Sequence, residues 1–291
     1  MATSSSTNDM AIGSDEMLIS LKATAHLRFQ DPHSDIVVAR AGTIDTSGKA
    51  IKNHERGQDV LVFMQKGTSQ SCDISRAKAR ASRVCLMPPD MSYADAASMV
   101  YPFVTGLTIL QTQLGIEFPS PSIGLARTVG SVPTALILGG ERALADALTQ
   151  LLHLALPGTS ILVACRVEDT SHPEPFEEAV RPFCHRALEN GAVYSIDAAA
   201  PDLLEHLQAA VDTYGASLQL VLDAGEEVTR WPGIMGMLDG GGKFVDCTRV
   251  HVDAGTHEDN CLSKVMATLE KLLDEGKLRP PICNDMYTTT L

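Results

Sequence analysis

Two adjacent glycines, Gly139 and Gly140, follow a continuous apolar run and precede a helical pattern. Glycines between a strand and a helix allow a tight turn, and the first N–H groups of the helix then point toward an anion. This arrangement is typical of a site for the diphosphate of a dinucleotide. The same glycines also serve as a plain strand-to-helix turn in many proteins, so taken alone they leave both interpretations open.

The residues after the glycines depart from the usual dinucleotide pattern. Ala145 stands where the last glycine of G-x-G-x-x-G would allow close helix–strand packing, and Glu141 puts a negative charge near the expected phosphate. Arg142 lies at the expected helix start, where the helix dipole does not favour a cation. It either binds an anion, offsets Glu141 or lies in solvent. The direction of the Glu141 side chain therefore decides whether a diphosphate fits.

Two further residues end strands of the same expected sheet. Arg166 follows the second strand, whose tip faces the adenosine ribose in dinucleotide folds, and arginine there suits a 2′-phosphate and NADPH. The alternative interpretation is that Arg166 is an exposed arginine without a role in binding. Asp223 ends the fourth strand, where carboxylates often hold loops by accepting backbone N–H groups. The predicted cofactor-binding residues are Gly139, Gly140, Arg142, Arg166 and Asp223.

No residue is assigned a catalytic role. The nine histidines are spread singly, the sequence has no G-x-S-x-G motif, and the seven scattered cysteines show neither C-x-x-C nor zinc-ligand spacing with histidine. A zinc site is therefore not expected. Tyr101, Thr105 and Lys243 are candidates to line a cleft, although core packing explains the first two equally well.

The elements that must position these residues are of two kinds. Near the N-terminus, short alternating runs at 17–25, 36–45 and 60–63 predict strands. A helix is expected after an N-cap at Ser92 and continues through 105–114. From residue 134 onward, apolar strands alternate with amphipathic helices, which is typical of right-handed βαβ units in a parallel sheet covered by helices on both faces. The expected strands are 134–138, 160–165, 193–197, 218–223 and 243–247, and the expected helices are 143–156, 175–190, 202–214, 228–238 and 260–275, followed by an extended segment over 277–282.

Composition narrows the range of partners. The chain has 291 residues, enough for two modest domains, and its hydrophobic share of 44% suits a well-filled core. The 36 acidic against 23 basic residues give a net charge of −13, so nucleic acids and anionic membranes are not expected as partners. Neither a signal peptide nor a membrane-length apolar run is present in the sequence, so a cytoplasmic location is expected.

The order of these segments resembles the medium-chain dehydrogenase/reductase superfamily, and more narrowly the fungal trans-acting enoyl reductases that serve polyketide synthases. The resemblance covers roughly residues 17–282, and it rests on the order and spacing of several short motifs rather than on any one of them. The motifs are Gly57-Gln58-Asp59-Val60, Ser92 to Ala97 (SYADAA), Phe118 to Ser122 (FPSPS), Gly139-Gly140 after Leu136 to Leu138, Asp197 with Pro201, Leu222-Asp223, Gly241 to Val245 (GGKFV) and Glu275 to Leu278 (EGKL).

The resemblance implies a Rossmann-type doubly wound parallel sheet with a shortened GroES-like β-rich catalytic domain. The implied division is a flexible tail at 1–14, a catalytic domain from 15–117 and 254–291, a loop at 118–132 and a cofactor domain at 133–253. The implied activity is NADPH-dependent reduction of an α,β-unsaturated thioester, with hydride delivered to the β-carbon. The implied partner is a polyketide synthase or its carrier protein, which holds the acyl thioester substrate.

Several positions differ from that family. Its members usually have a small hydroxylated pair after the glycines, where this chain has Glu141 and Arg142, and a tyrosine near the adenine, where this chain has Ala198. The stretch between Ala25 and Ala41 is also shorter. These differences support a second hypothesis, a non-reducing descendant that acts as a synthase partner or as a cofactor-free cyclase or isomerase.

Overall fold

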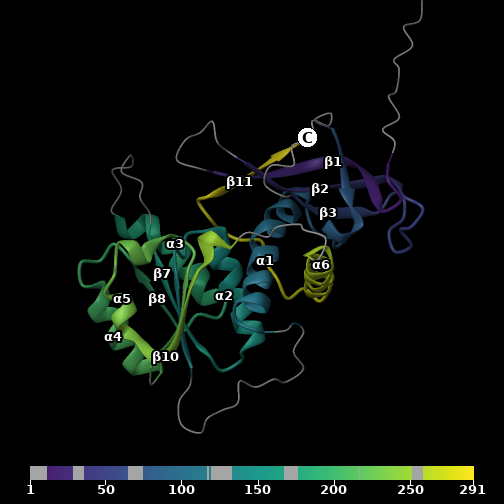
Figure 1. Cartoon of the computed structure of the whole chain (residues 1–291). Coiled ribbons are helices and arrows are strands. Elements are labelled where there is room, and N and C mark those ends of the chain that lie inside the picture. The colour runs from purple at the N-terminus through teal and green to yellow at the C-terminus, as the bar shows by residue number, and fades with distance from the viewer. Residues whose placement is uncertain are drawn as a thin grey trace, which may run out of the picture.

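The computed structural model describes residues 12–28, 36–64, 75–116, 118, 133–166, 176–215, 217–250 and 258–291. These residues form two sheets, one parallel and one antiparallel. Helix α1 (Tyr93–Thr112) lies between the sheets, where it packs on strands of the antiparallel sheet and on helix α2 (Ala143–Ala155) of the parallel one (Figure 1). A single hydrophobic core runs through this contact and joins both sheets.

The parallel sheet contains the strands that the apolar runs predicted. Its order is β10-β9-β6-β7-β8, and every pair of neighbours is parallel. The order of strands confirms a doubly wound sheet, because the chain starts in the middle of the sheet and reaches both edges. The strands are β6 (Thr134–Leu138), β7 (Ser160–Cys165), β8 (Tyr194–Asp197), β9 (Leu218–Asp223) and β10 (Leu238–Asp246).

Alternation along the strands places helices on both faces of this sheet. Ile137 of β6 belongs to the core cluster that contains the buried residues of α2 and α3 (Phe176–Glu189). Its neighbour Leu136 belongs to a second cluster with Leu203 and Leu207 of helix α4 (Leu203–Tyr214). Because successive side chains of a strand point to opposite faces, a strand apolar at every position needs a cover on each side. The helices supply that cover.

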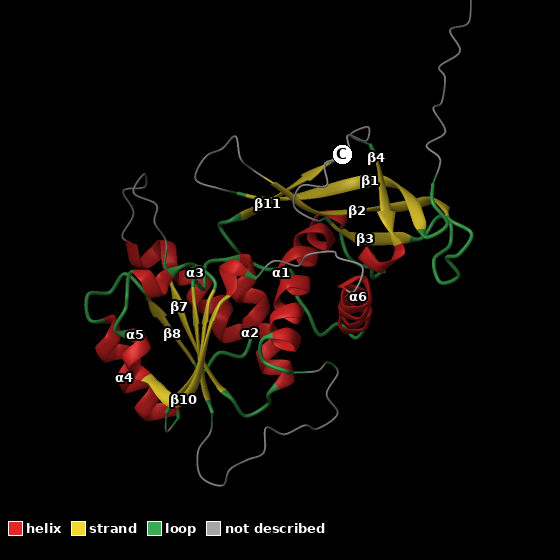
Figure 2. Cartoon of the chain, in the orientation of Figure 1, coloured by secondary structure: helices red, strands yellow, loops and turns green. Residues whose placement is uncertain are grey.

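The antiparallel sheet has six strands in the order β11-β1-β2-β3-β5, with β4 paired to β1 (Figure 2). Three of its strands were not expected from the sequence, namely β4, β5 and β11. They are short and are held by pairing with distant segments, so their local pattern is weak. The strands are β1 (Glu16–Leu27), β2 (Ile36–Ser47), β3 (Asp59–Phe63), β4 (Arg76–Arg80), β5 (Val84–Leu86) and β11 (Met286–Thr290), with a 3-10 turn at Ala81–Arg83.

Helix α1 begins where the capping pattern predicted. The hydroxyl of Ser92 accepts the backbone N–H of Asp95 at 3.1 Å, and the same hydroxyl donates to the Asp95 carboxylate at 2.7 Å. Helix α6 (Glu258–Asp274) packs against α1, and the chain then returns to the antiparallel sheet, where β11 pairs with β1. The segment after residue 277 therefore leads back to the β-rich part of the chain.

The prediction of a helix over residues 228–238 is wrong. The chain instead forms a 3-10 turn at Glu227–Thr229 and a short α5 (Ile234–Met237), and β10 begins at Leu238. Pro232 accounts for the interruption, because proline lacks an N–H donor and disfavours the helical conformation at the residue before it. Gly240 to Gly242 consequently lie within β10, and a further 3-10 turn, Cys247–Arg249, follows this strand.

Apart from residues 12–14 and Phe118, the predicted tail at 1–14 and loop at 118–132 lie outside the described residues. Within the residues that are described, every helix is too short or too polar to cross a membrane.

Candidate functional site

The turn between β6 and α2, residues 139–143, lies at the carboxyl edge of the parallel sheet. Gly139 has a φ of +77°, and a Cβ there would lie 2.8 Å from the backbone nitrogen of Gly225. A Cβ on Gly140 would lie 2.4 Å from the Cys165 sulfur. Both glycines are therefore required by the close approach of the loop after β9 and of β7. This packing accounts for them without reference to a ligand.

The backbone N–H groups of this turn already have acceptors inside the protein. Gly140 donates to the carbonyl of Ala164, and Arg142 donates to the carbonyl of Gly139, each at 2.9 Å. The N–H of Glu141 bonds the carboxylate of the same residue. Ala143, the first residue of α2, donates to the Asp285 carboxylate at 2.9 Å. These consecutive amides are the groups that would hold a diphosphate.

The Glu141 side chain points into the protein. It is only 4% exposed, and its carboxylate accepts the backbone N–H of Arg166 at 2.8 Å. Burial raises the pKa of Glu141 to about 7, against the stabilising effects of these backbone hydrogen bonds and of Arg142. The carboxylate thus bridges the ends of β6 and β7, across the edge where a dinucleotide would lie.

Asp285 occupies the anion position at the start of α2. The N-cap residue of this helix is Arg142, whose side chain makes no capping hydrogen bond. The Asp285 carboxylate takes that role from a distant part of the chain. Burial raises the pKa of Asp285, while the Ala143 N–H and the Arg142 charge lower it. Next to it, Asn284 donates its N–H to the carbonyl of Glu141 at 3.1 Å.

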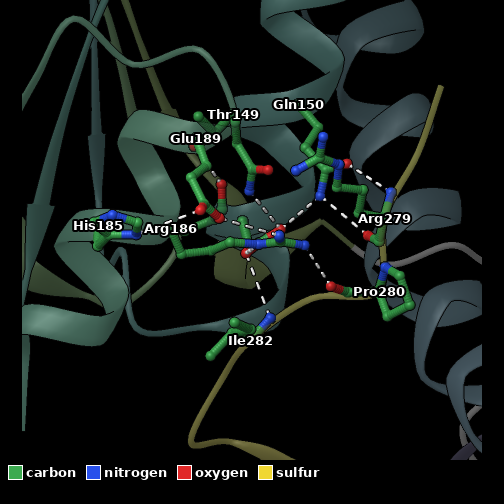
Figure 3. Close-up of polar contacts among 11 residues, drawn as sticks. Thr149, Gln150, His185, Arg186, Glu189, Arg279, Pro280 and Ile282 are labelled. Atoms are coloured by element: carbon green, nitrogen blue, oxygen red, sulfur yellow. Dashed lines mark hydrogen bonds and ion pairs between the residues drawn. The ribbon is translucent and has the colours of Figure 1, made fainter.

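Hydrogen bonds from α2 and α3 hold residues 279–282 (Figure 3), at the start of the 279–285 segment that carries Asp285. The side-chain amide of Gln150 donates to the carbonyl of Arg279 at 3.1 Å and accepts the N–H of Arg279 at 2.9 Å. The guanidinium of Arg186, on α3, donates to the carbonyl of Pro280 at 2.7 Å. The backbone at these two positions is therefore tied to both helices.

A buried carboxylate, Asp146, lies at the centre of this network. It accepts hydrogen bonds from Gln150 at 2.7 Å and from Asn190 at 3.1 Å, and its other oxygen lies 3.4 Å from both the Arg186 Nε and the Ile282 nitrogen. Burial raises the pKa of Asp146, and the hydrogen bonds from Gln150 and the Arg186 charge oppose this. Asp146 therefore links α2, α3 and the 279–285 segment.

The two arginines that were predicted to bind the cofactor, Arg142 and Arg166, each lie beside a carboxylate of the protein. The Nε of Arg142 lies 3.4 Å from Glu141, and a terminal nitrogen of Arg166 lies 3.8 Å from Glu227. Asp223 accepts three backbone N–H groups, from Gly225, Glu227 and Val228, at 2.9 to 3.1 Å. Asp223 thus holds the loop after β9. This is the role that carboxylates at strand ends often have, as an alternative to binding a cofactor. The assignment of these residues to a cofactor stays a prediction.

Two residues of this site, Asp285 and Glu227, were not selected by sequence reasoning. Neither lies in a motif, and each reaches the turn only through the packing of distant loops.

Tyr101 of α1 lies near Asp285, and burial together with the Asp285 charge raises the pKa of Tyr101. Thr105 is buried in the core, and Lys243 bonds the carbonyl of Gln113 at the end of α1. These three residues therefore have contacts that packing explains.

The residues present do not fit the diphosphate of a dinucleotide in this arrangement. The backbone N–H groups of Gly140, Arg142 and Ala143 are hydrogen-bonded within the protein, and two carboxylates, Glu141 and Asp285, lie where the anion would bind. Among the described residues, no group of three or more His, Cys, Asp or Glu side chains is placed to hold a metal ion.

Comparison with known proteins gives matches only at the level of structure. No family model matches the sequence, and no curated protein matches it. A putative zinc-dependent alcohol dehydrogenase from Rhizobium etli superposes with a TM-score of 0.65 at 16% identity, over 91% of this chain and 79% of that one. The CurK enoyl reductase gives 0.64 at 16% identity, over 92% and 82%.

A third solved structure is the Escherichia coli quinone oxidoreductase complexed with NADPH. It has a TM-score of 0.59 and 15% identity, over 91% of this chain and 81% of that one. These neighbours are oxidoreductases, and at such identities the likeness shows a common fold. The chain has the fold of the medium-chain dehydrogenases and reductases, a Rossmann-type parallel sheet joined to a GroES-like antiparallel sheet.

Proposed function

We propose that this chain is a non-reducing protein built on the fold of nicotinamide-dependent oxidoreductases, and that it acts without a dinucleotide at the β6–α2 turn. The observation that carries the proposal is the hydrogen bond from Ala143 to Asp285, by which the protein supplies its own anion to the start of α2. The buried carboxylate of Glu141, which lies in the same turn, adds a second negative group.

Magnitudes favour the internal carboxylate over a diphosphate. Two like charges 4 Å apart repel by about 4 kcal/mol at an effective dielectric constant of 20. A hydrogen bond at a helix start contributes only about 1 kcal/mol. A diphosphate that entered beside Asp285 and Glu141 would thus lose more through repulsion than it gained from the amides. Protonation of Glu141 removes one charge but leaves the side chain in place.

The proposed partner is a polyketide synthase or its carrier protein, which presents an acyl thioester. The support for this partner is the resemblance of motifs over residues 17–282, a range that includes the parallel sheet and most of the antiparallel sheet. We also propose that the protein is located in the cytoplasm, as the sequence analysis expects. Binding of an acyl-loaded carrier protein without NADPH, followed by fluorescence anisotropy, tests this part.

Titration of the full chain with NADPH, followed by calorimetry and cofactor fluorescence, tests the proposal directly. We expect no saturable binding up to millimolar NADPH at pH 7.5. The double variant Glu141→Ser with Asp285→Asn removes both carboxylates and is expected to bind NADPH measurably. The double variant Asp274→Asn with Glu205→Gln removes two exposed carboxylates, on α6 and α4, and serves as the control for net charge. Stoichiometric micromolar binding by the unmodified chain would reject the proposal.

A second candidate function is NADPH-dependent reduction of an α,β-unsaturated thioester. The observation that favours it is the fold shared with CurK enoyl reductase and with an NADPH complex of quinone oxidoreductase. The location of Arg166 at the end of β7, where arginine suits a 2′-phosphate, adds support. NADPH consumption on an enoyl thioester, together with saturable cofactor binding, would establish this candidate in place of the first.

A further inference from the structure

Three exposed glycines lie close together at one edge of the parallel sheet, and the packing of the chain does not account for them. Gly236 belongs to α5, and Gly240 and Gly241 belong to β10. None of the three has a φ in the left-handed region, and a Cβ on any of them would meet nothing within 4 Å. Gly139 and Gly140, by contrast, are required by contacts inside the protein. A glycine in a strand often marks a place where another backbone approaches closely.

Strand β10 is the last strand at its edge of the sheet. Among the described strands, β9 is the only neighbour of β10, and the pairing between these two strands is interrupted. Leu238 pairs with Leu218, and the next pair joins Lys243 to Leu220, so residues 239–242 lie opposite a single residue of β9. This bulge carries the first half of β10 away from β9. The edge therefore presents exposed backbone with few side chains.

Two exposed residues of opposite charge, Asp239 and Lys243, flank the glycines of β10. Because they are four positions apart in a strand, their side chains lie on the same face. The Asp239 carboxylate accepts the N–H of Gly240 at 2.8 Å, and the Lys243 ammonium donates to the carbonyl of Gln113. A carboxylate has two acceptor oxygens and an ammonium group has three N–H donors, so both side chains can also bind a partner.

We propose that β10 is the contact surface for a second copy of this chain, whose β10 pairs with it antiparallel about a twofold axis at Gly241. In this register, Asp239 lies directly opposite the partner's Lys243, and Lys243 lies opposite the partner's Asp239. Residues directly opposite each other in an antiparallel pair have Cβ atoms about 5 Å apart, which is close enough for an ion pair. The twofold symmetry forms each contact twice. The two five-stranded sheets then become one continuous sheet.

The charges favour this register and this partner. A pair centred on Asp239 or on Lys243 would place like charges directly opposite each other, whereas the pair centred on Gly241 places opposite charges there. Two chains that each carry a net charge of −13 repel each other over most of their surfaces, and the balanced charges of β10 avoid this repulsion. The paired segment is short, so we expect a dimer that dissociates on dilution. The contact does not involve the β6–α2 turn and is independent of the proposed function.

Sedimentation velocity of the full chain over a range of concentrations tests the proposal. Monomers should convert into dimers as the concentration rises, and added salt should weaken the dimer. Hydrogen exchange of residues 239–243 in the unmodified chain should slow over the same range of concentrations. A chain that stays monomeric up to millimolar concentration would overturn the proposal and show that the bulge and Lys243 protect the edge from pairing. Dimers without slower exchange at residues 239–243 would also overturn it.

Exchange of the two charges tests the register. Asp239→Lys and Lys243→Asp each place like charges opposite each other, so each variant alone should dimerise about tenfold more weakly or worse. An equimolar mixture of the two variants should dimerise like the unmodified chain, because every mixed pair again has opposite charges. Glu205→Lys makes the same charge change as Asp239→Lys at an exposed position of α4 and should dimerise normally. Unweakened dimers of Asp239→Lys, or a mixture no stronger than its parts, would contradict the register.

Discussion

The backbone N–H of Ala143 donates to the carboxylate of Asp285 at 2.9 Å, across 142 positions of sequence. Ala143 is the first residue of the helix that follows the glycine turn, and Asp285 immediately precedes β11 of the antiparallel sheet. This contact joins the two sheets at the place where a Rossmann-type fold normally binds a phosphate. The internal carboxylate has the charge sign that the helix start favours.

Removal of this cap should lower stability. Asp285→Ala leaves the Ala143 N–H without its carboxylate acceptor, so we expect a loss of about 1 kcal/mol in the free energy of unfolding. Asp285→Asn keeps an acceptor oxygen and should lose less. Urea unfolding measures both, with Asp274→Asn as the control that changes the same charge at an exposed position. An unchanged midpoint in Asp285→Ala would show that the hydrogen bond does not stabilise the fold.

The raised pKa of Glu141 predicts a pH-dependent stability. Its folded pKa of about 7 lies above the ordinary value of 4.5, so the folded state binds more protons than the unfolded state between these values. Stability attributable to Glu141 is therefore fully present below pH 4.5, falls as pH rises to 7 and is constant above it. The shift corresponds to about 3 kcal/mol, since one pKa unit is about 1.4 kcal/mol.

Glu141→Gln removes this titration. Urea unfolding of the unmodified chain and of this variant, measured from pH 4.5 to 8, should show that the variant loses less stability over the interval. Glu205→Gln changes an exposed glutamate of α4 and should leave the pH profile unchanged. Identical profiles for Glu141→Gln and the unmodified chain would mean that Glu141 is ionised throughout this range.

Loss of the buried Asp146 carboxylate should destabilise the protein more than loss of the Asp285 cap. Asp146→Ala leaves the buried Arg186 guanidinium without its buried ion-pair partner, so we expect a destabilisation of about 3 to 5 kcal/mol. Glu189→Gln alters a half-exposed partner of the same arginine and should cost less than about 1 kcal/mol. Hydrogen exchange at Ile282 should become faster in Asp146→Ala, because this N–H faces Asp146. Equal effects of the two substitutions would argue against a central role for Asp146.

Gly140 tests the close packing of the turn. In Gly140→Ala, the added Cβ would lie 2.4 Å from the Cys165 sulfur and 2.6 Å from a methyl group of Val163, so we expect a destabilisation of about 1 to 3 kcal/mol. A Cβ on Gly241 of β10 would meet nothing within 4 Å, and Gly241→Ala should therefore change stability by less than about 0.5 kcal/mol. Thermal unfolding compares the two variants. A tolerated Gly140→Ala would show that β7 can move away from the turn.

Local sequence patterns predicted most of the parallel sheet and the start of α1. Continuous apolar runs identified β6, β7 and β9, because strands covered on both faces need apolar side chains at successive positions. The Ser92 cap identified the start of α1, since the capping residues are only three positions apart. The same reasoning missed the short strands β4, β5 and β11, which form only by pairing with distant partners.

By itself, the sequence determined the alternation of strands and helices and identified Gly139-Gly140 as the turn to inspect, because these features depend on neighbouring residues. Only the tertiary structure decided that Glu141 points inward and that Asp285 reaches the start of α2. A side-chain direction in a turn depends on what packs around it, and a contact across 142 positions leaves no local pattern. The negative charge that Glu141 and Asp285 place at the β6–α2 turn therefore follows from the tertiary structure and cannot be predicted from local sequence.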